Sequence, residues 1–195
     1  MYRFRSIKYC STTALVSALL AIFGFASYWI VGKWIAMSLN GGIIQLFDGL
    51  LVALTAFIPG PMLLISGIVA GFLTDLMIAS NFSFTMLPAT VVIRILMFII
   101  IRIFMSKHWY SCFWTFFLAL LPIIIIYPLY TWVVYGSALA IIELLVDCVQ
   151  CGLSYVIGIM LYWQLSRIKS RSNNFLWNDE EFNYLKKAQP MVVNE

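Results

Sequence analysis

The sequence predicts an all-α membrane protein: a bundle of six transmembrane helices with the N- and C-termini on the cytoplasmic side. Of its 195 residues, 63% are apolar and only 10% are charged, and the mean hydropathy is +0.97. A soluble domain is about 45–50% apolar and about 25% charged. One membrane span takes roughly 20 residues, so the length suffices for about six spans and leaves no room for a soluble catalytic domain.

Apolar runs, separated by turn residues, give the six predicted helices. They cover residues 11–31, 41–58, 61–80, 86–106, 110–133 and 138–165. Pro61 and Pro88 open the third and fourth runs, where a missing backbone N–H costs nothing. Pro122 and Pro128 lie inside the fifth run and predict a kink or a break there.

The chain divides into a transmembrane domain, residues 1–166, and a cytoplasmic tail, residues 167–195. In the tail, Asn178 precedes three acids, and Lys186 and Lys187 follow. This order of cap and charge predicts a short helix.

Orientation follows from the basic residues. With six spans, the side that carries both termini holds Arg3, Arg5, Lys8, Arg102, Lys107, Arg167, Lys169, Arg171, Lys186 and Lys187. The opposite side has Lys33 alone, and Arg94 is intramembrane. Because cytoplasmic loops are rich in Lys and Arg, both ends are predicted to be cytoplasmic in a multi-pass protein of the cell membrane.

Polar residues inside the apolar runs form the candidate substrate site. They are Gln45, Asp48, Asp75, Asn81, Thr90, Arg94, Tyr127, Thr131, Glu143 and Asp147. At a rise of about 1.5 Å per residue, the intramembrane charges fall in the outer half of the membrane. A charge in hydrocarbon costs about 2.5–3.5 kcal/mol, so such groups face a bundle interior or a wet cavity. The pattern predicts a cup, open to the outside, for a small polar organic molecule.

Structural alternatives stand beside this prediction. Asp75 and Arg94 would also serve as an ion pair that holds two helices together. Glu143 and Asp147 would also fit a wet rim, and the aromatic residues near Tyr127 an interfacial belt.

Small residues mark close helix contacts. Gly67 and Gly71 form a GxxxG spacing, for which packing within the chain is the default. Ala14, Ala18 and Ala21 give the first helix a smooth stripe.

Three segments together resemble the S components, the substrate-binding membrane subunits of energy-coupling factor (ECF) vitamin importers. They are Ala14-x-x-x-Ala18, Gly60-Pro61…Gly67-x-x-x-Gly71…Asp75 and Leu87-Pro88-Ala89-Thr90…Arg94. The likeness covers about residues 10–166. It implies a prokaryotic six-helix subunit that binds a water-soluble vitamin near its outer face and topples in the membrane to deliver it. The alanine stripe would dock on the transmembrane coupling (T) subunit, which two ATPase subunits (A and A′) drive.

The chain carries no G-x-x-x-x-G-K-[ST] motif, so ATP hydrolysis would belong to those partners. No catalytic constellation accompanies the one histidine, His108. Cys148 and Cys151 lack the further ligands of a metal site. We therefore expect no enzyme activity, no cofactor or metal on this chain, and no nucleic-acid partner.

The favoured vitamin is pantothenate, because Thr90 and Arg94 lie one turn apart and a guanidinium binds a carboxylate in a planar fork. The surplus of acids also permits pyridoxine or a hydroxymethylpyrimidine. The rival interpretation is a non-transport scaffold such as the rod-shape morphogenesis protein MreD, which would explain the topology and the GxxxG spacing but not the layer of charges.

Overall fold

The computed structural model describes residues 7–34, 44, 46–57, 62–78, 81–105 and 110–171. This part of the chain is helical and contains no strand. Its helices are α1 (Ile7–Ser27), which continues as the π-helical turn η1 (Tyr28–Gly32), α3 (Phe47–Phe57), α4 (Met62–Ile78), α5 (Asn81–Phe104), α6 (Ser111–Tyr135) and α7 (Ser137–Arg171).

Within the described residues, four stretches are long and apolar enough to cross a membrane: Cys10–Ile30, Thr85–Phe104, Ser111–Tyr135 and Ser137–Arg167. Helices α3 and α4 are apolar but shorter. The 11 residues of α3 reach about 17 Å, against a hydrocarbon thickness of about 30 Å.

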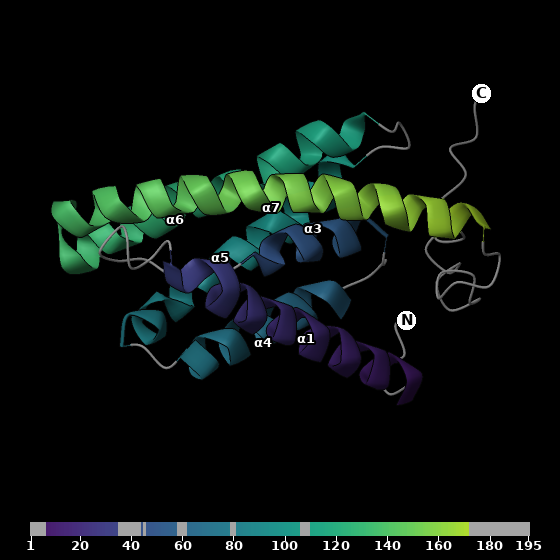
Figure 1. The fold of residues 1–195 in the computed structure, drawn as a ribbon, viewed down its shortest axis with the longest axis horizontal. Helices are drawn as coiled ribbons and strands as arrows, with labels where there is room; N and C mark the ends of the chain where they lie inside the picture. The colour runs from purple at the N-terminus through teal and green to yellow at the C-terminus, as the bar shows by residue number, and fades with distance from the viewer. Residues whose placement is uncertain are drawn as a thin grey trace, which may run out of the picture.

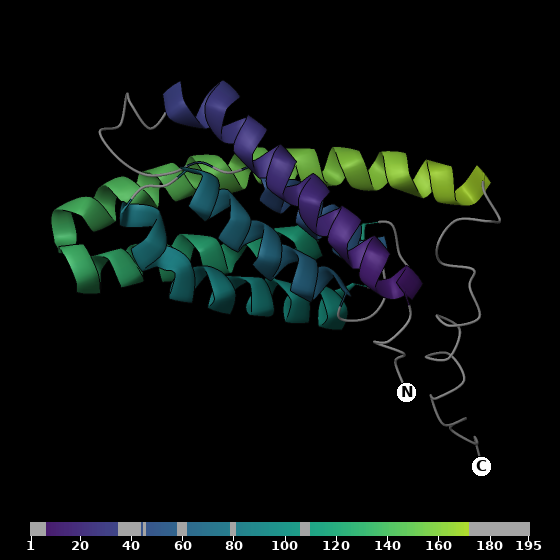
Figure 2. The ribbon, with the colours of Figure 1, turned by 90° about the horizontal axis from the view of Figure 1, so that it is seen from below.

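Helix α3 lies at the centre of the bundle (Figure 1). It packs on α7, α5, α1, α4 and α6, while α6 runs along α7 and α1 along α4. Seen from below, α1 runs obliquely across the line of α7 (Figure 2). The start of α1 and the end of α7 lie at one end of the bundle, and the turn between α6 and α7 lies at the other.

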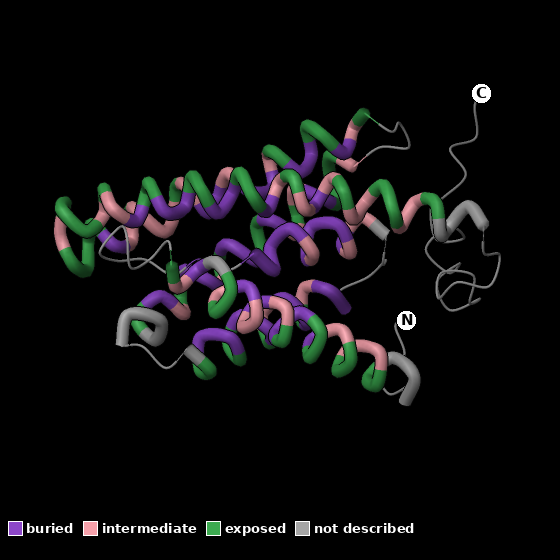
Figure 3. The backbone as a smooth tube through the Cα atoms, in the orientation of Figure 1, coloured by how far each residue is buried: buried purple, intermediate pink, exposed green. Residues whose placement is uncertain are grey.

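Burial follows the pattern of a protein with an apolar surround. Almost all of α3 is buried (Figure 3), whereas large apolar side chains such as Trp114 (71% exposed) and Val133 (84% exposed) point outward. Charged side chains lie inside, Arg94 at 2% and Asp48 at 0% exposure. Apolar groups outside and charges inside are what a lipid environment favours. The described chain is therefore helical, with the distribution of apolar and charged side chains expected of a protein embedded in a membrane.

Glycines set the closest helix contacts. A Cβ on Gly49 of α3 would lie 2.5 Å from the carbonyl oxygen of Ser154 on α7. Gly158, one turn further along α7, also lies next to Gly49. Gly67 contacts the side chain of Leu51 on α3, and Gly71 contacts Thr90 on α5. Packing of the GxxxG segment within the chain is thereby confirmed.

Some predicted boundaries are wrong. The segment 81–85 was predicted as a turn but forms the first turns of α5, which continues through Pro88. A proline there removes one backbone hydrogen bond, and its neighbours sustain the helix. The predicted break in the fifth run does not occur, since α6 is one helix through Pro122 and Pro128. Helix α7 runs past the predicted end of the domain to Arg171. The short helix predicted in the tail lies outside the described residues.

Candidate functional site

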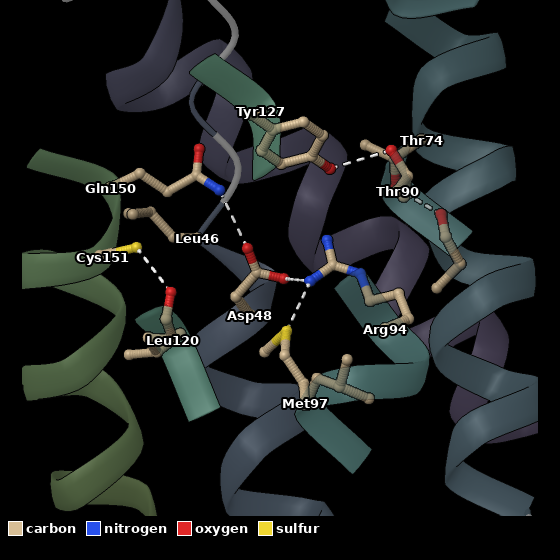
Figure 4. Close-up of polar contacts among 12 residues, drawn as sticks. Leu46, Asp48, Thr74, Thr90, Arg94, Met97, Leu120, Tyr127, Gln150 and Cys151 are labelled. Atoms are coloured by element: carbon tan, nitrogen blue, oxygen red, sulfur yellow. Dashed lines mark hydrogen bonds and ion pairs between the residues drawn. The ribbon is translucent and has the colours of Figure 1, made fainter. Parts of the chain in front are cut away.

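Arg94 of α5 is the largest fully buried side chain of the described structure. Its Nη1 forms an ion pair with Oδ1 of Asp48 and lies 3.3 Å from the sulfur of Met97 (Figure 4). The guanidinium carbon lies 4.6 Å from the centre of the Phe47 ring. A cation over an aromatic face gains electrostatic attraction, most of all away from water. The charge of Arg94 is therefore balanced inside the protein.

Asp48 receives a second contact from α7. Nε2 of Gln150 donates a hydrogen bond of 2.9 Å to Oδ2 of Asp48. Asp48 lies in the first turn of α3, where the helix dipole favours a negative charge. The close approach at Gly49 brings this turn against α7. Asp48, Arg94 and Gln150, from three helices, are called the polar centre below.

The start of α3 is also fixed from α1. The backbone N–H of Leu46 donates to Oγ of Ser27 at 3.1 Å, and this hydroxyl donates to the carbonyl of Gly24 at 2.8 Å. A hydrogen bond that satisfies a buried N–H at a helix start removes the penalty of leaving it unpaired. The turn that carries Asp48 is therefore held from two sides.

Two hydroxyls lie beside the polar centre. The hydroxyls of Thr90 and Tyr127 are 2.9 Å apart and hydrogen-bonded, which links α5 to α6. The Thr90 hydroxyl also lies 3.2 Å from the carbonyl of Met86. In Figure 4 the guanidinium of Arg94 lies between this pair and the carboxylate of Asp48.

Further acids line the same face of α7 as Gln150. Glu143 is 6% and Asp147 2% exposed, and Ser154, two turns beyond Asp147, is fully buried. Asp147 lies close enough to Glu143 and Asp48 to feel both negative charges. Oδ2 of Asp147 and Oγ of Ser154 have no hydrogen-bond partner among the described residues. The face formed by Glu143, Asp147, Gln150 and Ser154 is called the acidic face below.

The structure joins some of the predicted site residues and separates others. Arg94 forms an ion pair with Asp48, and Asp75 lies within electrostatic reach of Tyr127 in the same region. Asp75 is buried on α4 at 6% exposure, and Thr131 is buried on α6, 4.0 Å from the sulfur of Met86. Gln45 and the side chain of Asn81 lie outside the described residues. Glu143 and Asp147 are buried, so the wet-rim alternative is wrong.

Sequence reasoning placed Gln150 one turn below Glu143 and Asp147 on the same helix face, but it did not place Phe47 or Ser154 in the site. A seven-residue step from Asp147 to Ser154 puts both on one face of a helix. That signal would have found Ser154, whereas the contact of Phe47 depends on the rotation of α3.

Of the predicted docking stripe, Ala14 and Ala18 are exposed on α1. Ala21 is 4% exposed and packs with Leu20 and Phe47 in the core, so the exposed stripe is shorter than predicted.

A crevice reaches Arg94 between α3, α4 and α5. Its volume is about 10 Å³, room for about one water molecule, and Leu51, Thr55, Leu63, Met97 and Ile101 are among its lining residues. Of the predicted site residues only Arg94 lines it. Its wall comes from the later turns of α3 and the early turns of α4, so it does not correspond to the predicted outer cup.

Set beside family models, curated proteins and solved structures, the chain matches none of them. Its geometry is therefore the basis for any functional conclusion.

Proposed function

We propose that the protein is the substrate-binding S component of an ECF-type importer for a water-soluble vitamin. The observation that carries the proposal is the polar centre: a buried Arg, Asp and Gln contributed by three helices, inside a bundle whose outer surface is apolar. A membrane protein that needed only stability would fill this volume more cheaply with apolar side chains. Groups of this kind in a membrane bundle mark a site for a polar guest.

The proposed topology has six spans with both termini in the cytoplasm of a prokaryotic cell. It is supported by the common end at which α1 starts and α7 finishes. Arg102 and Arg167 are exposed and lie in the last turns of α5 and α7, whereas Lys33 follows η1, at the end of α1 opposite its start. Excess positive charge at one end is typical of the cytoplasmic side.

The proposed partners are the coupling (T) subunit, on which the exposed Ala14 and Ala18 would dock, and two ATPases that hydrolyse ATP. Replacing Ala14 with Trp should abolish co-purification with the coupling subunit while leaving vitamin binding unchanged, because a wide side chain prevents close helix approach. The matched control is Leu15→Trp, since Leu15 is 69% exposed beside Ala14 and already bulky. Normal co-purification of Ala14→Trp would overturn the docking assignment.

For an importer of this kind, binding of pantothenate tests the prediction that Thr90 and Arg94 bind a substrate carboxylate. A carboxylate that binds Arg94 has to share it with Asp48 or displace Asp48. The experiment is equilibrium binding of pantothenate, pyridoxine and hydroxymethylpyrimidine to the purified protein. Saturable binding of a vitamin supports the importer, and its absence across a full vitamin panel overturns it.

The second candidate is a membrane scaffold such as MreD. The observation that favours it is the mutual pairing of Asp48, Arg94 and Gln150 beside a small crevice with a mainly apolar lining. A scaffold would bind no vitamin but would retain partner proteins after solubilisation, so the same binding experiment separates the two candidates.

A further inference from the structure

Two buried carboxyl groups on the acidic face of α7 have no described basic partner. Glu143 and Asp147 lie one helical turn apart, and both are more than nine-tenths buried. No basic side chain contacts either carboxylate within the parts of the chain that the structure describes. Arg94, the buried base nearby, is already paired with Asp48.

The lack of a partner is clearest at one oxygen atom of Asp147. This residue lies within electrostatic reach of the carboxyl groups of Glu143 and Asp48, and its Oδ2 is buried without a hydrogen-bond donor among the described residues. An ionised carboxylate taken out of water costs several kcal/mol unless a cation or donors replace the water. Among the described residues, this oxygen therefore lacks a cation or an N–H or O–H donor.

An independent group on the same face lacks a partner as well. Oγ of Ser154 is fully buried, two turns from Asp147, and no described group bonds to it. Gln150, between them, already donates to Asp48. The unpaired oxygens thus form a row of acceptors along α7 beside the polar centre.

We propose that Glu143 and Asp147 form a subsite for the positively charged nitrogen of an organic solute, either a protonated amine or a cationic nitrogen heterocycle. This rests on the proposed function, and it names the class of vitamin that the importer takes. The cationic nitrogen lies between the two carboxylates, and the rest of the solute extends toward Asp48 and Arg94. An anionic solute is disfavoured, because Arg94 is already paired with Asp48.

The experiment measures equilibrium binding to the purified full-length protein at pH 7 with solutes graded by charge. Thiamine and pyridoxamine are cationic, pyridoxine and hydroxymethylpyrimidine are neutral, and pantothenate and biotin are anionic. Pyridoxamine and pyridoxine form the sharpest pair, since they differ by an aminomethyl in place of a hydroxymethyl group. We expect the tightest ligand to be cationic, with pyridoxamine preferred over pyridoxine at least about tenfold, a step of about 1.4 kcal/mol.

The variants Glu143→Gln and Asp147→Asn keep the side-chain shape and remove the charge. Each should weaken the cationic ligand about tenfold or more and change the neutral ligands less than about twofold. Cys148→Ser is the matched control, because Cys148 adjoins Asp147 but is exposed on the outer face of α7. It should bind like the wild type.

Tightest binding of an anionic or neutral vitamin, or equal loss of all ligands in Asp147→Asn, overturns the cation subsite and leaves the importer intact. Failure of the wild type to bind any solute overturns the importer and the subsite together. If the variants do not fold, the charge preference of the wild type alone decides.

Discussion

The polar centre and the acidic face meet at Gln150 of α7, yet their buried groups are paired to different extents. In the polar centre, Asp48 forms an ion pair with Arg94 and accepts a hydrogen bond from Gln150, although Nε of Arg94 has no described hydrogen-bond partner. On the acidic face, Glu143 and Asp147 lie one helical turn apart with no described cation, and Oδ2 of Asp147 has no described donor. The comparison teaches that the polar centre is largely satisfied within the bundle, whereas the carboxyl groups of the acidic face have no cation among the described residues.

The largest effect is expected where a completed pair is broken. Arg94→Ala leaves Asp48 charged, buried and without its cation, which costs about 3–5 kcal/mol of unfolding free energy. Denaturant unfolding in detergent measures it. The double variant Asp48→Leu/Arg94→Met, with no buried charge at this point, should recover most of the loss. A single variant as stable as the wild type would show that the pair is not formed.

The second-largest loss of stability is expected at Gly49, where α3 contacts α7. Gly49→Ala places a Cβ 2.5 Å from the Ser154 carbonyl, so α3 and α7 have to separate. Overpacking of this kind costs about 1–3 kcal/mol, and thermal unfolding reports it. Gly152→Ala on α7 is the matched control, since nothing lies within 4 Å of its added Cβ. Equal stability of the two variants would contradict the close α3–α7 contact.

On the acidic face, a substitution is expected to raise the stability of the protein instead of lowering it. Asp147→Asn removes a buried carboxyl group that has no described cation, and with it the cost of keeping that ionisable group away from water, so the ligand-free protein should gain about 1 kcal/mol in stability. The same thermal-unfolding assay measures the gain, with Cys148→Ser as the reference. A loss comparable to that of Arg94→Ala would mean that Asp147 has an internal cation after all.

The smallest effect is expected at the hydroxyl pair beside the polar centre. Thr90→Val and Tyr127→Phe each remove one partner of the same 2.9 Å hydrogen bond. Each should cost about 1 kcal/mol. The double variant should cost less than the sum, since the bond can be lost only once. Strict additivity in this cycle would show that the two hydroxyls act independently.

Much of the fold follows from the sequence, because apolar length and turn residues are local properties. The six helical segments were predicted, and so was the intramolecular packing of Gly67 and Gly71. Boundaries at Asn81 and Arg171 were not, since helix ends depend on what the flanking turns pack against. Apolar composition alone does not decide whether α3 and α4 cross the membrane, because both helices are shorter than the four candidate spans.

Most residues of the site were predicted from the sequence, but which of them contact one another was not. Depth along a helix can be counted from the sequence, so Asp48, Arg94 and Glu143 were placed in one layer. The rotation of each helix about its axis cannot be counted in this way. It is set by contacts such as Gly49 against Ser154, and it decides that Asp48 contacts Arg94.

The most direct test of the account is the affinity of the purified wild-type protein for the charge-graded vitamin panel, measured by equilibrium titration. The account predicts saturable binding, strongest for a solute with a cationic nitrogen. Binding of none of these vitamins would contradict it, and the buried charges would then serve only to hold the helices together.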